Sequence, residues 1–150
     1  MTAAAPPRTS GPDILHASCV SLAGRGVLIR GPSGSGKSAL ALELMARGAA
    51  LVADDRTEVH RRGAQVFARA PAAIFGLIEA RGVGLLQAEA VSEVQLCVIV
   101  DMSVLETERL PRHVEEQLMG IALPRLGRVD SAHFPAALIQ YLKGGVLDPD

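Results

Sequence analysis

The feature that most constrains this chain is a glycine-rich octapeptide that fits the pattern G-x-x-x-x-G-K-[ST] at every fixed position. Glycine allows backbone conformations that are closed to other residues, so several N–H groups of such a loop can converge on phosphate oxygens. The lysine adds a positive charge near the β- and γ-phosphates, and the serine hydroxyl can bind Mg²⁺. The candidate nucleotide-binding residues are therefore Gly31, Pro32, Ser33, Gly34, Ser35, Gly36, Lys37 and Ser38, with Ser38 also a candidate metal ligand.

The segments on either side of the octapeptide support this interpretation. Residues 26–30 have the pattern of a short buried strand, and residues 38–47 have that of a helix that ends at Gly48. A helix that begins at the loop adds the positive end of its dipole to an anion site. Residues 17–22 are also apolar, and the glycines at 24 and 26 indicate a turn, so we expect a hairpin that leads into the loop.

The composition predicts one globular domain. The chain has 150 residues, of which 49% are hydrophobic, and its net charge of -1 argues against a broad nucleic-acid interface. We expect the domain to cover residues 13–143, between a disordered leader at 1–12 and a loose tail at 144–150. Cys19 and Cys97 lie in apolar, strand-like runs, which predicts buried free thiols in a reducing cytosol.

Two strand-like runs end in carboxylates that could act on a nucleotide. Residues 50–53 are followed by Asp54 and Asp55, and residues 94–100 are followed by Asp101. Ligands of α/β sheets bind at the carboxyl ends of strands, so either run could supply the acid that holds Mg²⁺. In the Asp54–Asp55 pair, one acid could hold Mg²⁺ and the other could accept a proton from an attacking hydroxyl, and the sequence does not say which. Spacing alone does not choose between the two runs.

The remaining segments carry weaker signals. We expect a small hairpin over 59–69, a short helix within 71–78, a partly helical charged segment over 106–119 and an amphipathic helix over 132–143. The Leu123–Arg128 segment has the composition of a loop with two cations. The segment with Glu79 and Arg81 before two glycines suits either ligand contact or an ion-paired surface turn.

Four of these features occur together in one known family. His16, the octapeptide, Val52-Ala53-Asp54-Asp55-Arg56 and Glu79-Ala80-Arg81-Gly82-Val83-Gly84 resemble, in order and spacing, the catalytic domain of bacterial HPr kinase/phosphorylase. The resemblance runs from about residue 14 to residue 143. It implies an α/β fold, a P-loop domain of the phosphoenolpyruvate-carboxykinase type with a mixed β-sheet and flanking helices. Members of the family are usually cytoplasmic hexamers.

The resemblance also implies an activity. The family uses ATP and Mg²⁺ to phosphorylate a serine of the phosphocarrier protein HPr, and it removes that group with phosphate to give pyrophosphate. In the family the strand that corresponds to residues 94–100 carries no metal ligand. Either aspartate of the neighbouring pair could be the general base. The residues to which the resemblance assigns roles are His16, Lys37, Asp54, Asp55, Arg81 and Arg109 as catalytic residues, and Ser38 and Glu79 as metal ligands.

The chain also departs from the family pattern. Full-length members carry a further N-terminal domain, so this sequence resembles the short form found in some proteobacteria. The family's dephosphorylation loop reads Pro-Val-Lys-Pro-Gly-Arg, and here its cation, glycine and final arginine persist as Arg125, Gly127 and Arg128, but the prolines differ. Two alternatives stay open, namely a P-loop kinase of small molecules and a non-catalytic nucleotide-binding regulator.

Overall fold

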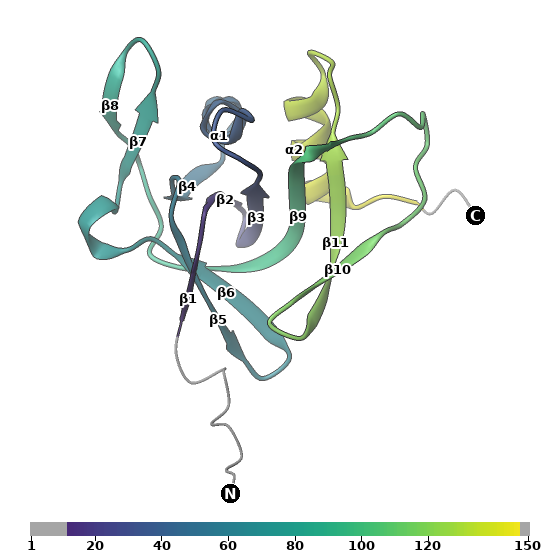
Figure 1. The fold of residues 1–150 in the computed structure, drawn as a ribbon, viewed down its shortest axis with the longest axis horizontal. Helices are drawn as coiled ribbons and strands as arrows, with labels where there is room; N and C mark the ends of the chain where they lie inside the picture. The colour runs from purple at the N-terminus through teal and green to yellow at the C-terminus, as the bar shows by residue number, and fades with distance from the viewer. Residues whose placement is uncertain (1–11, 148–150) are drawn as a thin grey trace, which may run out of the picture.

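The fold is a curled, mixed β-sheet with two helices against one face (Figure 1). The computed structural model describes residues 12–147, so most of the expected leader and the end of the expected tail lie outside the described residues. The main sheet has the order β1-β5-β6-β9-β3-β2-β4, and β11 pairs with β9 while β10 pairs with β11. Strands β7 and β8 form a separate hairpin that projects from the body of the fold (Figure 1). None of the helices within 12–147 has the length and apolar content needed to cross a bilayer.

The element bounds follow the chain. Within residues 12–147 the helices are α1 (Lys37–Ala46), α2 (Phe134–Gly144) and the 3₁₀ turn η2 (Ala72–Ile74). The strands are β1 (Asp13–Leu15), β2 (Ala17–Leu22), β3 (Arg25–Arg30), β4 (Ala50–Ala53), β5 (Thr57–Arg62), β6 (Gln65–Arg69), β7 (Leu77–Ala80), β8 (Gly84–Gln87), β9 (Val94–Leu105), β10 (Glu115–Leu118) and β11 (Ile121–Arg128).

The two faces of the sheet are buried in different ways. On one face α1 and α2 pack over the central strands, and residues such as Val27, Ile29 and Leu44 form one core cluster. On the other face the sheet covers itself, because β5, β6 and β11 contribute side chains that pack against Leu28 and Ile99 of the central strands. Both faces of β3 and β9 are therefore buried, which explains their nearly continuous apolar sequence.

Several expectations from the sequence are confirmed. Strands β2 and β3 form the antiparallel hairpin that leads into the glycine-rich loop, and α1 begins directly after that loop. The β5–β6 hairpin and the helix α2 also lie close to the expected positions. Cys19 is fully buried, which raises the pKa of its thiol, whereas Cys97 is only half-buried; both are free.

Two expectations about the region after Asp101 are wrong. Residues 106–119 form no helix, because this charged segment has no apolar face to bury and instead ends in the edge strand β10. The Leu123–Arg128 segment is not a loop but part of β11, which runs parallel to β9. Strand β9 continues to Leu105 rather than ending before Asp101, and β11 pairs with its residues 99–101 and, after a register shift, with Leu105.

Gly127 is required by the close approach of β11 to β9. A β-carbon at this position would lie 2.8 Å from the carbonyl oxygen of Val104, which belongs to the backbone and cannot move aside cheaply. We expect Gly127→Ala to lower the free energy of unfolding by roughly 1–3 kcal/mol, measured by urea denaturation. The matched control is Gly144→Ala, whose nearest neighbour would be at 3.5 Å and which should change stability by less than about 0.5 kcal/mol. Equal stability of the two variants would contradict this packing.

Candidate functional site

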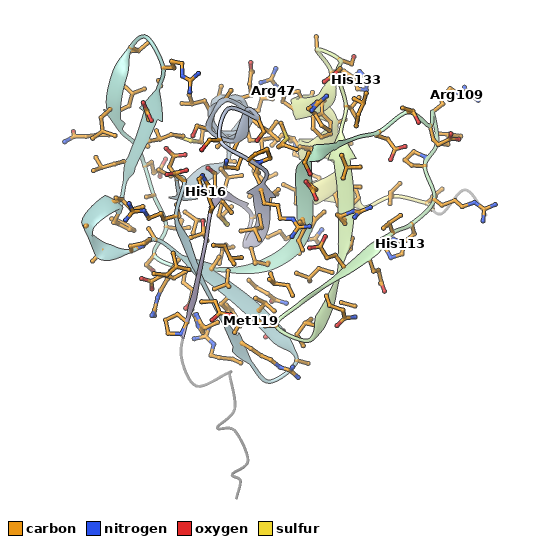
Figure 2. All side chains as sticks on the ribbon, viewed as in Figure 1. His16, Arg47, Arg109, His113, Met119 and His133 are labelled. Carbon is orange, nitrogen blue, oxygen red and sulfur yellow. The ribbon has the colours of Figure 1, made fainter. Side chains whose placement is uncertain are left out.

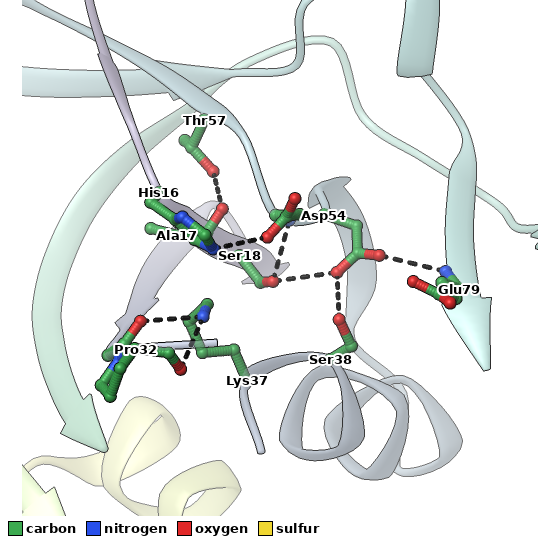
Figure 3. Close-up of polar contacts among 11 residues, drawn as sticks. His16, Ala17, Ser18, Pro32, Lys37, Ser38, Asp54, Thr57 and Glu79 are labelled. Atoms are coloured by element: carbon green, nitrogen blue, oxygen red, sulfur yellow. Dashed lines mark hydrogen bonds and ion pairs between the residues drawn. The ribbon is translucent and has the colours of Figure 1, made fainter. Parts of the chain in front are cut away.

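The glycine-rich loop has the backbone geometry that the sequence predicts. Gly31, Gly34 and Gly36 have φ values of 148°, 82° and 98°, which other residues rarely adopt. The Lys37 side chain is buried, and its Nζ donates hydrogen bonds to the carbonyl oxygens of Gly31 at 2.8 Å and Pro32 at 3.2 Å. The ammonium group is therefore held against the first turn of the loop, at the N-terminal end of α1 (Figure 3).

Asp54 joins three elements around this loop (Figure 3). Its Oδ1 accepts hydrogen bonds from the hydroxyl of Ser18 on β2 at 2.9 Å and from that of Ser38 on α1 at 2.6 Å. Its Oδ2 accepts a hydrogen bond from the backbone N–H of Glu79 on β7 at 3.0 Å. Asp54 is only 8% exposed, so its carboxylate is a buried acceptor for three donors. A P-loop serine beside a carboxylate at a strand end is the arrangement that holds Mg²⁺ in P-loop enzymes.

Asp55 has a different environment although it is the next residue. Its side chain is 60% exposed, and its Oδ1 lies 2.8 Å from Nε2 of His16. Its φ is +68°, and the N–H of Arg56 donates to the carbonyl oxygen of Asp54 at 2.7 Å, which makes a tight three-residue turn. Such a backbone conformation costs roughly 1–3 kcal/mol for a residue with a side chain and is concentrated at functional sites. The turn therefore directs the Asp54 carboxylate into the protein and leaves the Asp55 carboxylate exposed to solvent.

Hydrogen bonds to the backbone hold this turn in place. The Ser18 hydroxyl accepts a hydrogen bond from the N–H of Asp55 at 3.1 Å, and the N–H of Ala17 donates to the carbonyl oxygen of Asp55 at 3.1 Å. The Thr57 hydroxyl donates to the carbonyl oxygen of Ala17 at 2.8 Å. Ser18 is a site residue that the sequence analysis missed. The sequence did contain a signal for Ser18. It lies two positions after His16, and residues two positions apart point to the same side of an extended segment.

The β7–β8 hairpin carries Glu79 and Arg81. The backbone of Glu79 is tied to Asp54, whereas Arg81 is exposed at the turn. Both residues line a cavity of about 410 Å³ in the hairpin, together with the two glycines of the segment. The hairpin thus places Glu79 beside the Asp54 carboxylate (Figure 3), while Arg81 lies further along it.

The other predicted cations lie in the segment before β10 and on β11. Arg109 is exposed in the segment before β10, and Figure 2 shows it far from His16, so a single chain does not bring these two residues together. Arg125, Gly127 and Arg128 lie on β11. Arg128 Nη1 donates to the carbonyl oxygen of Met102 at 3.0 Å, and a β-carbon at Gly31 would lie 3.1 Å from Cβ of Met102. Met102 thus lies between Arg128 and Gly31, the first residue of the loop.

Asp101 does not contact the loop serine. Its Oδ1 accepts hydrogen bonds from the hydroxyl and the N–H of Ser103 at 2.6 and 3.0 Å, and its Oδ2 pairs with Nη2 of Arg30 at 3.1 Å. The carboxylate that accompanies Ser38 is that of Asp54. Of the two strand ends that the sequence offered, the geometry therefore favours the one after β4.

Comparison with known proteins shows the family of the chain. A model of the HPr serine kinase C-terminal domain matches residues 9–118, which is most of the chain. The chain belongs to this family. HPr kinase/phosphorylase of Streptococcus thermophilus strain LMD-9 is 39% identical over 146 residues, a region that covers 85% of this chain and 47% of the relative. The corresponding protein of Streptococcus salivarius is 38% identical over 148 residues.

The chain spans about half the length of the curated relatives it matches. A solved structure of the Hpr(Ser) kinase/phosphatase from Coxiella burnetii has a TM-score of 0.75, with 23% identity, and the match covers 87% of this chain and 94% of that one. At this identity the likeness shows the fold. The fold of this chain is therefore that of the HPr kinase C-terminal domain.

The oxygen donors around Ser38 suit Mg²⁺. Within residues 12–147, no three side chains of His, Cys, Asp and Glu gather closely enough to hold a metal by themselves. Mg²⁺ is usually bound by one or two carboxylates together with water and substrate phosphates, so a dedicated cage is not required. The Ser38 hydroxyl and the Asp54 carboxylate, with Glu79 beside them, match this chemistry.

The environment of Asp101 predicts a pH effect on stability. Burial by itself raises the pKa of its carboxyl, but the hydrogen bonds from Ser103 and the charge of Arg30 outweigh it, and the pKa lies below its ordinary value of 3.8. A depressed carboxyl pKa stabilises the fold above the unfolded-state pKa, and this contribution is lost as the pH falls through the folded-state pKa. We expect Asp101→Asn to lower the free energy of unfolding at pH 7 and the difference from wild type to shrink below about pH 4. A difference that stays constant on acidification, measured by urea denaturation, would contradict this electrostatic origin.

Proposed function

We propose that this chain is the catalytic domain of an ATP- and Mg²⁺-dependent protein serine kinase that acts on HPr. Its P-loop fold would be of the phosphoenolpyruvate-carboxykinase type, and it would work in the cytoplasm as a homo-oligomer, a hexamer by resemblance to the family. The observation that carries the proposal is the pairing of Ser38 with Asp54 directly beside the exposed His16–Asp55 pair. A phosphate-binding loop and a candidate base thereby meet at one edge of the sheet.

The loop would bind the nucleotide. Its N–H groups and the Lys37 ammonium would hold the β- and γ-phosphates, with the dipole of α1 adding to the positive field. Ser38, Asp54 and Glu79 would hold Mg²⁺, which when bound neutralises charge on the phosphates. Asp54 is suited to this place because it is buried and already oriented by Ser18 and the Glu79 backbone.

Asp55 is the better candidate for the general base. Its carboxylate is exposed, while that of Asp54 already accepts three hydrogen bonds. In the forward reaction Asp55 would accept the proton of the acceptor serine as its oxygen bonds to the γ-phosphorus and ADP leaves. His16 would orient the Asp55 carboxylate through their 2.8 Å contact.

The reverse reaction would use the same groups. An oxygen of inorganic phosphate would attack the phosphorus of phosphoserine to form pyrophosphate, and the departing serine oxygen would take a proton from Asp55. Arg81 and Arg109 would neutralise charge during transfer, and Arg125, Gly127 and Arg128 would serve dephosphorylation. Because Arg109 is remote from His16 within one chain, its role requires movement of its loop or a second copy of the protein.

Mass spectrometry of HPr tests the proposal. HPr incubated with the protein, ATP and Mg²⁺ should gain one phosphoryl group on a serine, and addition of phosphate in excess should remove it with release of pyrophosphate. Modification of a nucleoside or another small molecule instead would favour a small-molecule kinase. Nucleotide binding without any transfer would favour a non-catalytic regulator.

A further inference from the structure

A second cavity of about 410 Å³ adjoins the proposed site on the side of His16. It lies between the corner of β1 and β2 and the edge strand β10, over the ends of β3 and β9. We call it the Arg30 pocket. Its lining includes Leu15, Arg30, Asp101, Glu116 and Leu118. His16, which contacts Asp55, and Gly31, the first residue of the glycine-rich loop, also line it. The pocket therefore borders both the His16–Asp55 pair and the loop.

The polar part of the Arg30 pocket is negative. Arg30 Nη2 contacts Oδ2 of Asp101 at 3.1 Å and Oε1 of Glu116 at 2.5 Å. One guanidinium thus faces two carboxylates, whose side chains are only 11% and 20% exposed. Because a single positive charge neutralises one of the two acids, the three groups together favour a further cation.

The apolar part of the pocket indicates the shape of that cation. Leu15 and Leu118 line the pocket, are half-buried and pack against the buried cluster that contains Leu28 and Ile99. Lysine and arginine bury their methylene stems on apolar surface while the charged head reaches a polar partner. A basic side chain matches this combination of half-buried leucines and carboxylates better than a short or acidic side chain does.

We propose that the Arg30 pocket binds a lysine or arginine side chain of the acceptor protein, close in sequence to the phosphorylated serine. This inference rests on the proposed kinase function. The acceptor hydroxyl must reach Asp55, and His16 contacts Asp55 while lining the pocket. Since an extended chain spans up to about 3.6 Å per residue, a basic residue within a few positions of the serine can reach this neighbouring pocket. Glu116 is then a specificity-determining residue for the acceptor.

Kinetics of Glu116→Gln test the proposal. We expect the KM for HPr to rise roughly tenfold, while kcat and the Kd for nucleotide stay within about twofold of wild type. Glu116→Asp, which keeps the charge, should restore most of the loss. The matched control is Glu115→Gln on the same strand, whose carboxylate contacts His113 outside the pocket and whose KM should not change. A KM for Glu116→Gln equal to wild type would overturn the proposal.

A double-mutant cycle separates recognition from a structural role of Glu116. Each lysine or arginine within a few residues of the HPr serine is replaced by alanine and assayed with wild type and with Glu116→Gln. One HPr variant should raise the KM for wild type roughly tenfold but leave the KM for Glu116→Gln nearly unchanged. Additive effects for every HPr variant would overturn the pocket assignment while leaving the kinase function intact. Absence of any transfer to HPr by wild type would instead overturn the proposed function and the acceptor pocket with it.

Discussion

Replacement of Lys37 by alanine is expected to lower kcat/KM for phosphoryl transfer to HPr by roughly 1,000-fold or more. The Lys37 ammonium is the buried cation of the glycine-rich loop, where it lies against the carbonyl oxygens of Gly31 and Pro32. A charge held in this position needs no reorganisation when negative charge develops on the transferred group, so its removal acts on the transition state. Transfer measured with labelled ATP over a range of HPr concentrations gives the ratio directly.

The control for this substitution is the other lysine of the chain. Lys143 is exposed in the last turn of α2, so Lys143→Ala should retain kcat/KM within about twofold. Thermal unfolding of both variants separates a lost charge from a lost fold. Substantial transfer by a folded Lys37→Ala variant would show that the loop is not the site of the γ-phosphate.

The second large effect is expected from a comparison of the two adjacent aspartates. Asp55→Asn removes the exposed carboxylate and should lower kcat by roughly 10²–10⁴-fold, with little change in the Kd for nucleotide. Asp54→Asn alters the buried acceptor of Ser18 and Ser38 and should weaken Mg²⁺-dependent nucleotide binding by roughly 10–100-fold. Isothermal titration with a non-hydrolysable ATP analogue and Mg²⁺, together with single-turnover transfer, measures the two quantities separately.

The opposite division of effects would reverse the assignment. If Asp54→Asn stopped transfer without affecting nucleotide binding, and Asp55→Asn weakened binding, Asp54 would be the base. His16→Ala provides a matched test of the pair, because it leaves Asp54 untouched. It should lower kcat in wild type, because the carboxylate loses the contact that orients it, but have no further effect in Asp55→Asn.

Much of the phosphate site could be predicted from the sequence because its parts are local. The glycine-rich loop needs unusual φ values within eight residues, and the strand before it and the helix after it follow from short apolar patterns. The apolar run at residues 50–53 likewise predicts β4, which ends directly before Asp54 and Asp55. The sequence could not decide between Asp54 and Asp101, because that choice depends on which strand end lies beside Ser38 in three dimensions.

The features that escaped prediction depend on distant segments. The ion pairs of Arg30 join residues that are 71 and 86 positions apart, so no local pattern could show them. Strand β11 contains Pro124 and Gly127, which are typical of loops, and it forms a strand because it pairs in parallel with the central strand β9. The difference between Asp54 and Asp55 likewise arises from Ser18, which a hairpin brings back to the turn.

A crystal structure with HPr, a non-hydrolysable ATP analogue and Mg²⁺ tests the central claim most directly. The distance between the γ-phosphorus and the nearest carboxylate oxygen of Asp55 should be at most about 6 Å, with the acceptor serine hydroxyl between them. That limit is the sum of a hydrogen bond to the base and a near-attack contact to phosphorus. A γ-phosphate bound on the far side of the loop, with Asp55 directed away from it, would contradict the proposed mechanism.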